Sequence, residues 1–366
     1  MRARPAPAAL CLLLLAAPNG PAAAASRQTA NVILVTTDGL RWQEVFGGAD
    51  ERLLGERGGV EDAAELRRAF WRETPEARRE ALLPFLWQVV AREGQIYGNA
   101  ARGSSAQVTN GRNFSYPGYN ELLSGVADPR IDSNDKRPNP NVTVLEWLNR
   151  REAYRGRVAA FCSWDVFPFI INRERSGVLV NADDDPVAAA GRPDLEMLNR
   201  LLADTTPAAR GVRHDSFTFA AALEHWRAER PRVLYLGLGE TDDWAHAGRY
   251  DRYLETAHRF DRFVARLWQE LQRRDGYRGR TSLVITTDHG RGSEPEDWKS
   301  HGEKIPASRN MWIAVLGPDT PALGERAETA PVTQAQVAAT VAALLGEDFT
   351  ASVPAAAPPI ADALRR

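Results

Sequence analysis

Three aspartates of the 366-residue chain each come after a short apolar run. The runs NVILVTTDG, RVLYLGLGETDD and SLVITTDHG carry Asp38, Asp242 and Asp288. A single aspartate in this position is most often a turn residue or the N-cap of the next helix. Three aspartates in comparable positions make that explanation insufficient, and we interpret them as ligands of metal ions.

Histidines strengthen this interpretation. His246 follows Asp242 by four residues, His289 is adjacent to Asp288, and His301 lies in KSHGEK, on a loop before the next expected strand. Carboxylate and imidazole ligands of this kind suit zinc, with manganese or iron as alternatives, and two neighbouring groups of ligands indicate two divalent ions. Structural roles are expected for the other three histidines, His214, His225 and His258.

A serine lies where a turn becomes a helix in NFSYPGYNELLSG, residues 113–125. We expect Ser115 at the helix N-terminus, where unsatisfied N–H groups and the positive end of the helix dipole favour an anion. A bound metal would lower the pKa of the hydroxyl further and make it nucleophilic without a histidine base. An ordinary serine N-cap, with Tyr116 and Pro117 in the first turn, explains the local sequence equally well.

The elements that must position these residues follow an α/β pattern. Continuous apolar runs too short for helices are typical of parallel strands covered on both faces. Ligands of such sheets bind at the carboxyl ends of the strands, which is where the three aspartates would lie. Further strands are expected over 156–163 and 309–317, and helices over 215–229 and 251–274.

A last helix is expected from Thr333, with Gln336 completing a capping box, to Gly346. Together these elements predict an α/β fold with a mostly parallel central sheet. We expect a single catalytic domain over residues 26–366. Residues 49–81 are charged and contain several glycines, and we interpret them as an insertion near the site.

The first 25 residues have the three-part plan of a secretory signal: two arginines, the apolar run ALCLLLLAA, and small residues before Ser26. We therefore predict a signal peptide over 1–25 and an exported protein, periplasmic or secreted, without a membrane anchor once the signal is removed. Cys11 falls in the signal, which leaves Cys162 without a disulfide partner.

Charge gives no indication of a polyanionic partner. The chain has 46 basic and 48 acidic residues, with a formal charge of −2, and no basic face stands out. No nucleic-acid-binding surface is therefore expected.

The same residues resemble the alkaline phosphatase superfamily, and most closely its branch of type I phosphodiesterases and nucleotide pyrophosphatases. The motifs, in order, are TTDGLRW, FSYPGYNELLSG, ETDDWAH, TTDHGRG and SHGEK. The resemblance implies a three-layer sandwich with helices on both faces of the sheet. It implies that one ion is held by Asp38, Ser115, Asp288 and His289, and the other by Asp242, His246 and His301.

The resemblance further implies that the partner is a small-molecule phosphate ester. In-line attack of Ser115 on its phosphorus would form a phosphoseryl enzyme, from which water then releases phosphate. In this branch an asparagine after a short I-x-x-N run binds a phosphate oxygen, and IDSN places Asn134 at about the expected distance. An exposed asparagine that caps a turn is the alternative.

Monoesterases of the superfamily usually bring lysine and arginine to the phosphate, but the comparable segment here, FCSWDVFPF, is aromatic. Arg173 and Arg175 follow it in a segment that a solvated turn explains equally well. Trp164, Phe167 and Phe169 could face an apolar leaving group, which favours diesters over monoesters.

Three other activities compete with this one. A sulfatase would need an arginine where Tyr119 stands, so we expect Ser115 to stay unmodified. Transferases with similar ligands are generally membrane-anchored, and no anchor is expected here. The chain could also bind phosphorylated ligands without turnover.

The glycosylation triplet Asn113-Phe-Ser115 is interpreted as accidental, which fits a bacterial protein.

Overall fold

The computed structural model describes Met1, residues 27–189 and residues 191–365. The predicted signal peptide and Cys11 therefore lie outside the described residues. Among the described residues, no helix combines the length and the apolar character that crossing a membrane requires. Cys162 is a buried free cysteine.

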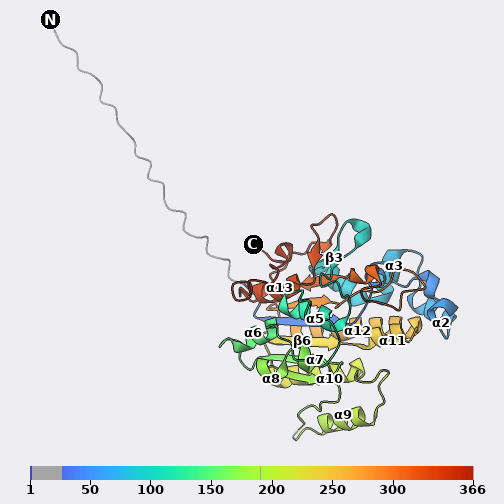
Figure 1. Ribbon diagram of the computed structural model, residues 1–366, viewed down its shortest axis with the longest axis horizontal. Helices are drawn as coiled ribbons and strands as arrows, with labels where there is room; N and C mark the ends of the chain where they lie inside the picture. The colour runs from blue at the N-terminus through green and yellow to red at the C-terminus, as the bar shows by residue number, and fades with distance from the viewer. Residues whose placement is uncertain (2–26, 190, 366) are drawn as a thin grey trace.

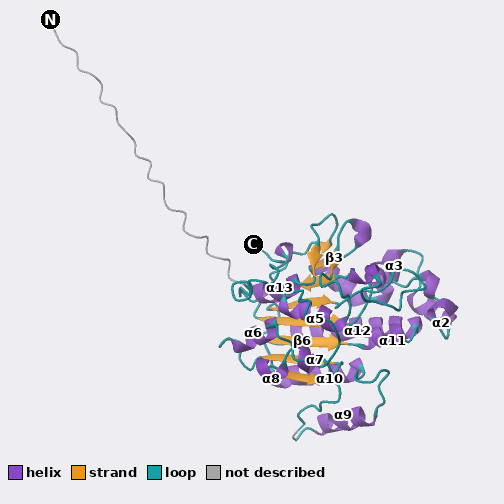
Figure 2. Ribbon diagram, viewed as in Figure 1, coloured by secondary structure: helices purple, strands orange, loops and turns teal. Residues whose placement is uncertain are grey.

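A twisted sheet runs through the middle of the molecule (Figures 1 and 2). Within the described residues it has eight strands in the order β5-β4-β6-β1-β7-β8-β2-β9. Their bounds are β1 Asn31–Thr37, β2 Gln95–Tyr97, β4 Val158–Cys162, β5 Leu179–Ala182, β6 Val233–Leu238, β7 Thr281–Thr286, β8 Ile313–Leu316 and β9 Gly324–Glu325. A separate parallel pair joins β3 (Ala106–Gln107) to β10 (Val332–Thr333).

Five neighbouring strands, from β5 to β7, run parallel, whereas β8 is antiparallel to both β7 and β2. Every residue of β1, β6 and β7 is buried, because both faces of the sheet are covered. The mostly parallel sheet predicted from the continuous apolar runs is confirmed. The strand within 309–317 exists, but it runs against the others.

Helices form a layer on each face of the sheet (Figure 1). Alternate residues of β1 point to opposite sides: Ile33 and Val35 join one core cluster, and Val32 and Leu34 the other. The first cluster is closed by α2 (Ala63–Phe70), α3 (Pro75–Leu82), α10 (Asp215–Glu229) and α12 (Tyr250–Gln272). The second is closed by α5 (Ser115–Ser124), α6 (Val144–Arg150), α7 (Phe167–Ile170) and α13 (Gln336–Leu344).

The remaining helices are short or peripheral. They are α1 (Trp42–Gly47), α4 (Ala91–Glu93), α8 (Arg173–Ser176), α9 (Pro193–Asp204) and α11 (Glu240–His246). In Figure 1, α9 projects at the bottom of the view, beyond the edge strand β5. The three-layer α/β sandwich that the sequence predicts is confirmed.

Two element bounds differ from the sequence prediction. The run 232–243 ends as a strand at Leu238 and continues as the helix α11, because the acidic residues after Gly239 suit the first turn of a helix. The last helix begins at Gln336 rather than Thr333. The Gln336 side chain does accept a hydrogen bond from the Thr333 N–H (3.0 Å), but Thr333 itself pairs in β10.

Residues 49–81 contain α2 and most of α3 and contribute Leu53, Leu66 and Phe70 to the first core cluster. Arg249, three residues after His246, contacts Glu61 at 2.8 Å. The segment thus packs beside the end of α11. Whether it is an insertion into a single catalytic domain stays a prediction.

Candidate metal centre and active site

The three aspartates meet at one edge of the sheet. Asp38 follows β1, and its N–H donates to the carbonyl of Leu238 at the end of β6 (2.9 Å). Asp288 follows β7, the other neighbour of β1. Asp242 lies in the first turn of α11, directly after β6. Because β6, β1 and β7 are parallel neighbours, their carboxyl ends bring together side chains that are far apart in the sequence.

A first group of potential ligands consists of Asp38, Asp288 and His289, whose ligand atoms all lie within 4.8 Å of one another. His289 Nε2 is 3.3 Å from Asp38 Oδ1 and 3.4 Å from Asp288 Oδ2. Both of these carboxylate oxygens are buried without a hydrogen-bond partner. Buried, unpartnered carboxylate oxygens are costly unless a cation compensates them, so this group fits a metal ion.

Burial and the charge of Asp38 raise the pKa of Asp288. Burial disfavours the charged form of His289, but the carboxylates of Asp288 and Asp38 outweigh it and raise the pKa of His289 to about 9. Positive charge is thus favoured where these three side chains meet. A divalent ion would meet the same electrostatic demand.

A second group consists of Asp242, His246 and His301. The helix α11 places Asp242 and His246, four residues apart, on one face, with His246 Nε2 at 3.2 Å from Asp242 Oδ2. His301 comes from the loop after β7, and its Nε2 is 2.9 Å from His246 Nε2. Two imidazole nitrogens that face each other with a carboxylate are a donor set suited to zinc.

Second contacts orient the imidazoles. His289 Nδ1 lies 2.9 Å from the Gly290 carbonyl and His301 Nδ1 lies 3.3 Å from the Asn113 carbonyl. Donation from Nδ1 leaves Nε2 as the ligand atom in both rings. Burial, together with the positive charges of His289 and Arg291, lowers the pKa of His301, which keeps that ring neutral and able to bind metal.

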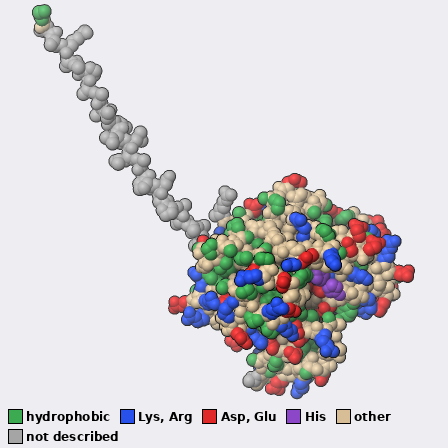
Figure 3. All heavy atoms as spheres, viewed as in Figure 1, with side chains coloured by type: hydrophobic (Ala, Val, Ile, Leu, Met, Phe, Trp, Pro, Cys, Tyr) green, Lys and Arg blue, Asp and Glu red, His purple; other side chains and the backbone are tan. Residues whose placement is uncertain are grey.

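The two groups are adjacent. The rings of His289 and His301 stack with centroids 4.0 Å apart, and His289 Nε2 is 4.0 Å from Asp242 Oδ1. Histidine side chains are visible together in a hollow of the surface in Figure 3. The arrangement fits two neighbouring divalent ions, as the sequence predicts, and the identity of the metal stays a prediction.

Ser115 is the first residue of α5 and is buried. Phe114, not Ser115, is the N-cap, and the N-cap residue makes no side-chain capping bond, so the alternative of an ordinary serine N-cap is wrong. The Ser115 hydroxyl instead lies 3.4 Å from His289 Nε2. Gly118 permits this approach, because a Cβ there would come within 2.5 Å of the Asp288 carbonyl oxygen.

Asn134 reaches the same helix end. Its Oδ1 accepts a hydrogen bond from the Tyr116 N–H at 2.9 Å, one residue after Ser115. The side chain therefore caps the first turn of α5 and at the same time lies beside the nucleophile position. Its role in binding a phosphate oxygen stays a prediction.

Two residues that contact the ligands were not predicted from the sequence. Tyr119 donates to Asp38 Oδ2 (3.1 Å). Arg291, fully buried, contacts the Asp242 carboxylate and donates to the carbonyls of Gly39 and Lys299. A basic residue two positions after His289, in DHGRG, was the available signal for Arg291. Tyr119 has no such signal, because a helical tyrosine is usually a core residue.

The segment after β4 supplies no cation to the site. Arg173 pairs with Asp185 (2.9 Å), and Arg175 pairs with Glu146 (2.7 Å). Phe167 is a core residue packed against Tyr119, with ring centroids 4.6 Å apart, and so does not face a leaving group. Trp164 and Phe169 are partly exposed.

Asn113 has a left-handed backbone, with φ 53°, and its side chain is buried. The glycosylation triplet that begins at Asn113 is therefore inaccessible in the folded protein. This agrees with its interpretation as accidental.

Comparison with known proteins decides the family. Residues 52–348, more than half of the chain, match the family model of type I phosphodiesterases and nucleotide pyrophosphatases. The chain belongs to this family. The matched segment contains Ser115 and all three histidine-bearing motifs, whereas Asp38 precedes it. No curated protein sequence matches the chain.

Solved structures share the fold at low sequence identity. The alkaline phosphatase PafA is 11% identical, with a TM-score of 0.62, and the match covers 94% of this chain and 100% of PafA. The phosphonate monoester hydrolase SpPMH from Silicibacter pomeroyi is 12% identical, with a TM-score of 0.57 over 92% of this chain and 76% of that one. The lipoteichoic acid synthase LtaP from Listeria monocytogenes is 13% identical, with a TM-score of 0.56 over 89% and 74%.

Membership of the phosphodiesterase family, on an alkaline-phosphatase-like fold, indicates a hydrolase of phosphate or sulfate esters.

Proposed function

We propose that this phosphodiesterase-family chain hydrolyses phosphate esters, with diesters preferred, through Ser115 as the nucleophile and two divalent ions, with zinc as the proposed metal. The observation that carries the proposal is the position of the Ser115 hydroxyl. It lies at the start of α5, makes no capping bond, and faces the group formed by Asp38, Asp288 and His289.

When bound, the ions would supply Lewis acidity that lowers the pKa of the serine hydroxyl and offsets charge on the phosphoryl oxygens. Ser115 Oγ then attacks phosphorus, a serine–phosphorus ester forms, and the bond to the leaving oxygen breaks. Water cleaves the phosphoserine in a second step, with net retention at phosphorus. The positive N-terminal end of α5, where Ser115 lies, would stabilise negative charge on the phosphoryl oxygens.

The preference for diesters rests on which side chains surround the site. Arg173 and Arg175, the cations closest in sequence to the aromatic segment, are engaged by Asp185 and Glu146. Neither arginine therefore supplies the extra positive charge that a monoester dianion would need. Asn134 offers a neutral amide, which suits the singly charged phosphate of a diester.

The test compares p-nitrophenyl phosphate with bis-p-nitrophenyl phosphate, with and without a chelator. We expect hydrolysis of both, faster for the diester, and loss of both after metal removal. Turnover that survives removal of the metal contradicts the proposal. Tryptic mass spectrometry of the peptide that contains Ser115 excludes the sulfatase alternative if the serine is unmodified.

We also propose that the chain is exported to the periplasm or beyond, on the basis of the signal-like pattern in residues 1–25. N-terminal sequencing of the protein from a bacterial host tests this. A mature N-terminus near Ser26 is the expected result, and an intact Met1 in the purified protein contradicts it.

A further inference from the structure

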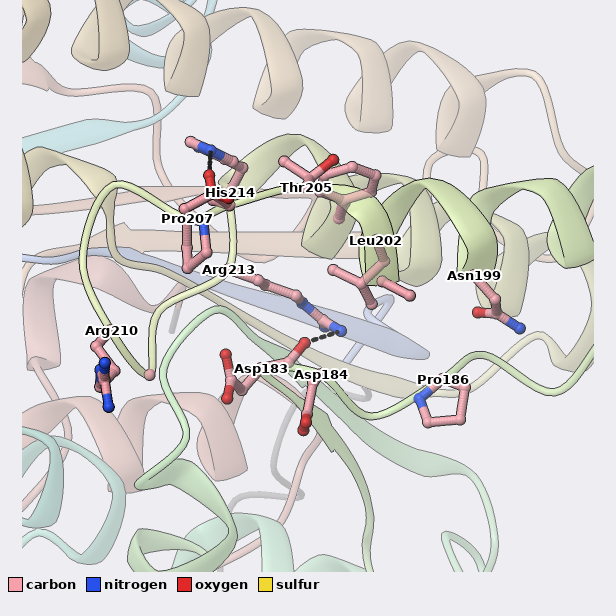
Figure 4. Close-up of a pocket in the computed structure, with 14 residues that line it drawn as sticks. Asp183, Asp184, Pro186, Asn199, Leu202, Thr205, Pro207, Arg210, Arg213 and His214 are labelled. Atoms are coloured by element: carbon pink, nitrogen blue, oxygen red, sulfur yellow. Dashed lines mark hydrogen bonds between the residues drawn. The ribbon is translucent and has the colours of Figure 1, made fainter.

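A cavity of about 700 Å³ lies between the end of β5, helix α9 and the start of α10 (Figure 4). Three segments line it: residues 183–186 after β5, residues 199–207 of α9 and the loop that follows, and residues 210–217, which lead into α10. None of the metal-ligand residues lines this cavity. Its volume is that of a site for a small organic molecule.

The cavity lies at the same edge of the sheet as the metal-ligand groups. Its wall residue His214 places Nδ1 at 2.8 Å from Glu240 Oε1, and Glu240 begins α11, the helix that carries Asp242 and His246. The strand before α11, β6, pairs directly with β1. In the order β5-β4-β6-β1, three strand spacings of ~4.8 Å separate the end of β5 from the end of β1. The His214 wall adjoins α11 directly, so it is the part of the cavity that a substituent on a phosphate held at the end of β1 would meet first.

A series of contacts also joins the cavity to the nucleophile loop. Asn134, which bonds to the Tyr116 N–H, is followed two residues later by Lys136, whose Nζ is 2.6 Å from Asp165 Oδ2. The Asp165 N–H donates to the Gly211 carbonyl at 2.9 Å, and Gly211 lines the cavity. A group attached to phosphorus and directed past Asn134 would therefore meet the cavity wall.

Several charged side chains of the cavity are free to form hydrogen bonds with a ligand. Among the described residues, the side chains of Asp183, Asp184 and Arg210 have no ion-pair partner within 4.0 Å. Arg213, by contrast, is buried and donates to the Asp183 carbonyl (2.9 Å) and to Asn181 Oδ1 (2.8 Å), as Figure 4 shows for the first bond. It therefore holds the wall in place.

Carboxylates and a guanidinium in one cavity disfavour a charged ligand of either sign. An ammonium group would meet Arg210, and an anion would meet Asp183 and Asp184. Burial and the charges of Asp184 and Asp165 raise the pKa of Asp183, so the carboxyl gains from hydroxyl partners. Leu202 and Phe217 add an apolar surface. A ligand with hydroxyl groups around an apolar ring face would match these charged side chains and this apolar surface.

We propose that the cavity binds a neutral polyhydroxylated substituent, a sugar or a polyol, of the phosphate ester that Ser115 attacks. The inference rests on the proposed function and adds the class of group that the substrate carries. In the first step the Ser115 oxygen bonds to phosphorus and the other ester oxygen leaves, while the substituent stays on phosphorus. Water then breaks the bond between Ser115 and phosphorus and releases the substituent as its phosphate monoester. The cavity therefore determines specificity and does not take part in bond making.

The test uses three synthetic diesters with the same p-nitrophenolate leaving group, in which the retained alcohol is methanol, choline or the 6-hydroxyl of glucose. We expect the zinc-loaded protein to hydrolyse the glucose diester with a kcat/KM about tenfold or more above that of the methyl diester. Equal values for the three diesters overturn the proposal. A preference for the choline diester overturns the assignment of a neutral ligand.

Neighbouring leucines of α9 give a matched pair of variants. Leu202 lines the cavity, whereas Leu201 is 52% exposed on the outer side of the helix. Leu202→Trp fills the cavity and should reduce the glucose-to-methyl ratio of kcat/KM to about one, while Leu201→Trp should keep the wild-type ratio. If Leu202→Trp does not fold, Ala203→Trp, which fills the same cavity from an exposed position, replaces it. An unchanged ratio in the cavity-filling variant overturns the proposal.

Failure of the proposed function gives a different result. A wild-type protein that hydrolyses neither p-nitrophenyl phosphate nor any diester contradicts catalysis by Ser115. Calorimetric binding of glucose 6-phosphate then tests the cavity without turnover. Binding that Leu202→Trp abolishes and Leu201→Trp retains supports the cavity as a sugar site, and binding that neither variant changes refutes it.

Discussion

The two metal-ligand groups differ in how firmly the fold holds them. Asp288 and His289 are completely buried, whereas the His246 side chain is 51% exposed. The buried group stands at the ends of two paired strands, β1 and β7. The exposed group combines a two-turn helix, α11, with a loop that carries His301. Ligands fixed by the sheet lose little freedom on binding an ion, while ligands on a short helix and a loop lose more.

The two groups also differ in what surrounds their carboxylates. Asp38 Oδ1 and Asp288 Oδ2 are buried without partners, whereas the Asp242 carboxylate already contacts Arg291. A cation therefore offsets a larger desolvation cost in the buried group than in the exposed one. We expect the buried group to bind its ion more tightly.

The largest expected effect comes from the hydroxyl that faces the buried group. Ser115→Ala should lower kcat for a p-nitrophenyl diester by about 10³-fold or more, since it removes the nucleophile. Ser216→Ala, on an exposed residue of α10, is the control and should keep wild-type turnover. Undiminished turnover in Ser115→Ala contradicts the assignment of the nucleophile.

Chelation tests the comparison directly. We expect zinc to leave in two steps as the concentration of chelator rises, with the second equivalent held about tenfold or more tightly than the first. His246→Ala should eliminate the weaker equivalent and leave the stronger one. Elemental analysis after dialysis measures both. His258→Gln, on α12, serves as the control, and simultaneous loss of two equivalents from the wild type would show that the groups are not distinct.

Removal of a single hydrogen bond to the buried group has a smaller effect. Tyr119→Phe deletes the hydroxyl that donates to Asp38 and should lower kcat/KM by about five- to tenfold, which corresponds to about 1 kcal/mol. Tyr277→Phe deletes another buried hydroxyl, which donates to the Pro231 carbonyl. Tyr277 precedes β7, whereas the ligands Asp288 and His289 follow it, so this hydroxyl lies at the opposite end of the strand. Both variants lose stability, but only Tyr119→Phe should lose activity. Equal activities of the two variants contradict a role for Tyr119.

The smallest effect concerns a buried carboxylate that needs no ion. Both carboxylate oxygens of Asp261 accept bonds, from the N–H groups of Phe85 (2.7 Å) and Leu86 (2.9 Å), whereas Asp288 Oδ2 has no partner. Burial nevertheless raises the pKa of Asp261 from 3.8 to about 7. The folded state then binds this proton more tightly than the unfolded state, so the contribution of Asp261 to the free energy of unfolding falls as the pH rises from about 4 to about 7.

The variant Asp261→Asn removes this titration. Chemical denaturation at several pH values should show a weaker decrease of stability between pH 4 and 7 in the variant than in the wild type. Zinc content should be the same in both proteins. Identical pH profiles of stability would mean that the pKa of Asp261 is not raised.

Much of the candidate site was predictable because its residues follow recognisable strand ends. Asp38 and Asp288 come directly after apolar runs, and parallel strands place such residues at one edge. The pair Asp242 and His246 was expected at a strand end, and the two side chains meet because a helix, α11, follows β6. The spacing of four residues still predicted that both side chains face one point.

Other features were beyond local sequence patterns. The local sequence around Ser115 is compatible both with a helix N-cap and with a nucleophile. Only the fold shows that the Ser115 hydroxyl does not cap the helix. Phe167 was expected to face a leaving group, but it packs under Tyr119, because residues of a segment after a strand can turn either to the core or to the cleft. Strand β8 is antiparallel to its neighbours but is as apolar as the parallel strands of the sheet. Amino-acid composition therefore cannot predict the direction in which it runs.

The sequence by itself determined the α/β class, the buried parallel strands and the set of residues able to bind metal, because periodicity, strand-end position and side-chain chemistry are local properties. Only the tertiary structure decided which imidazole nitrogen faces which carboxylate, that Tyr119 and Arg291 contact two of the ligands, and that a cavity lies beside α9. Those features depend on distances between segments that are remote in the chain, and such distances follow from packing.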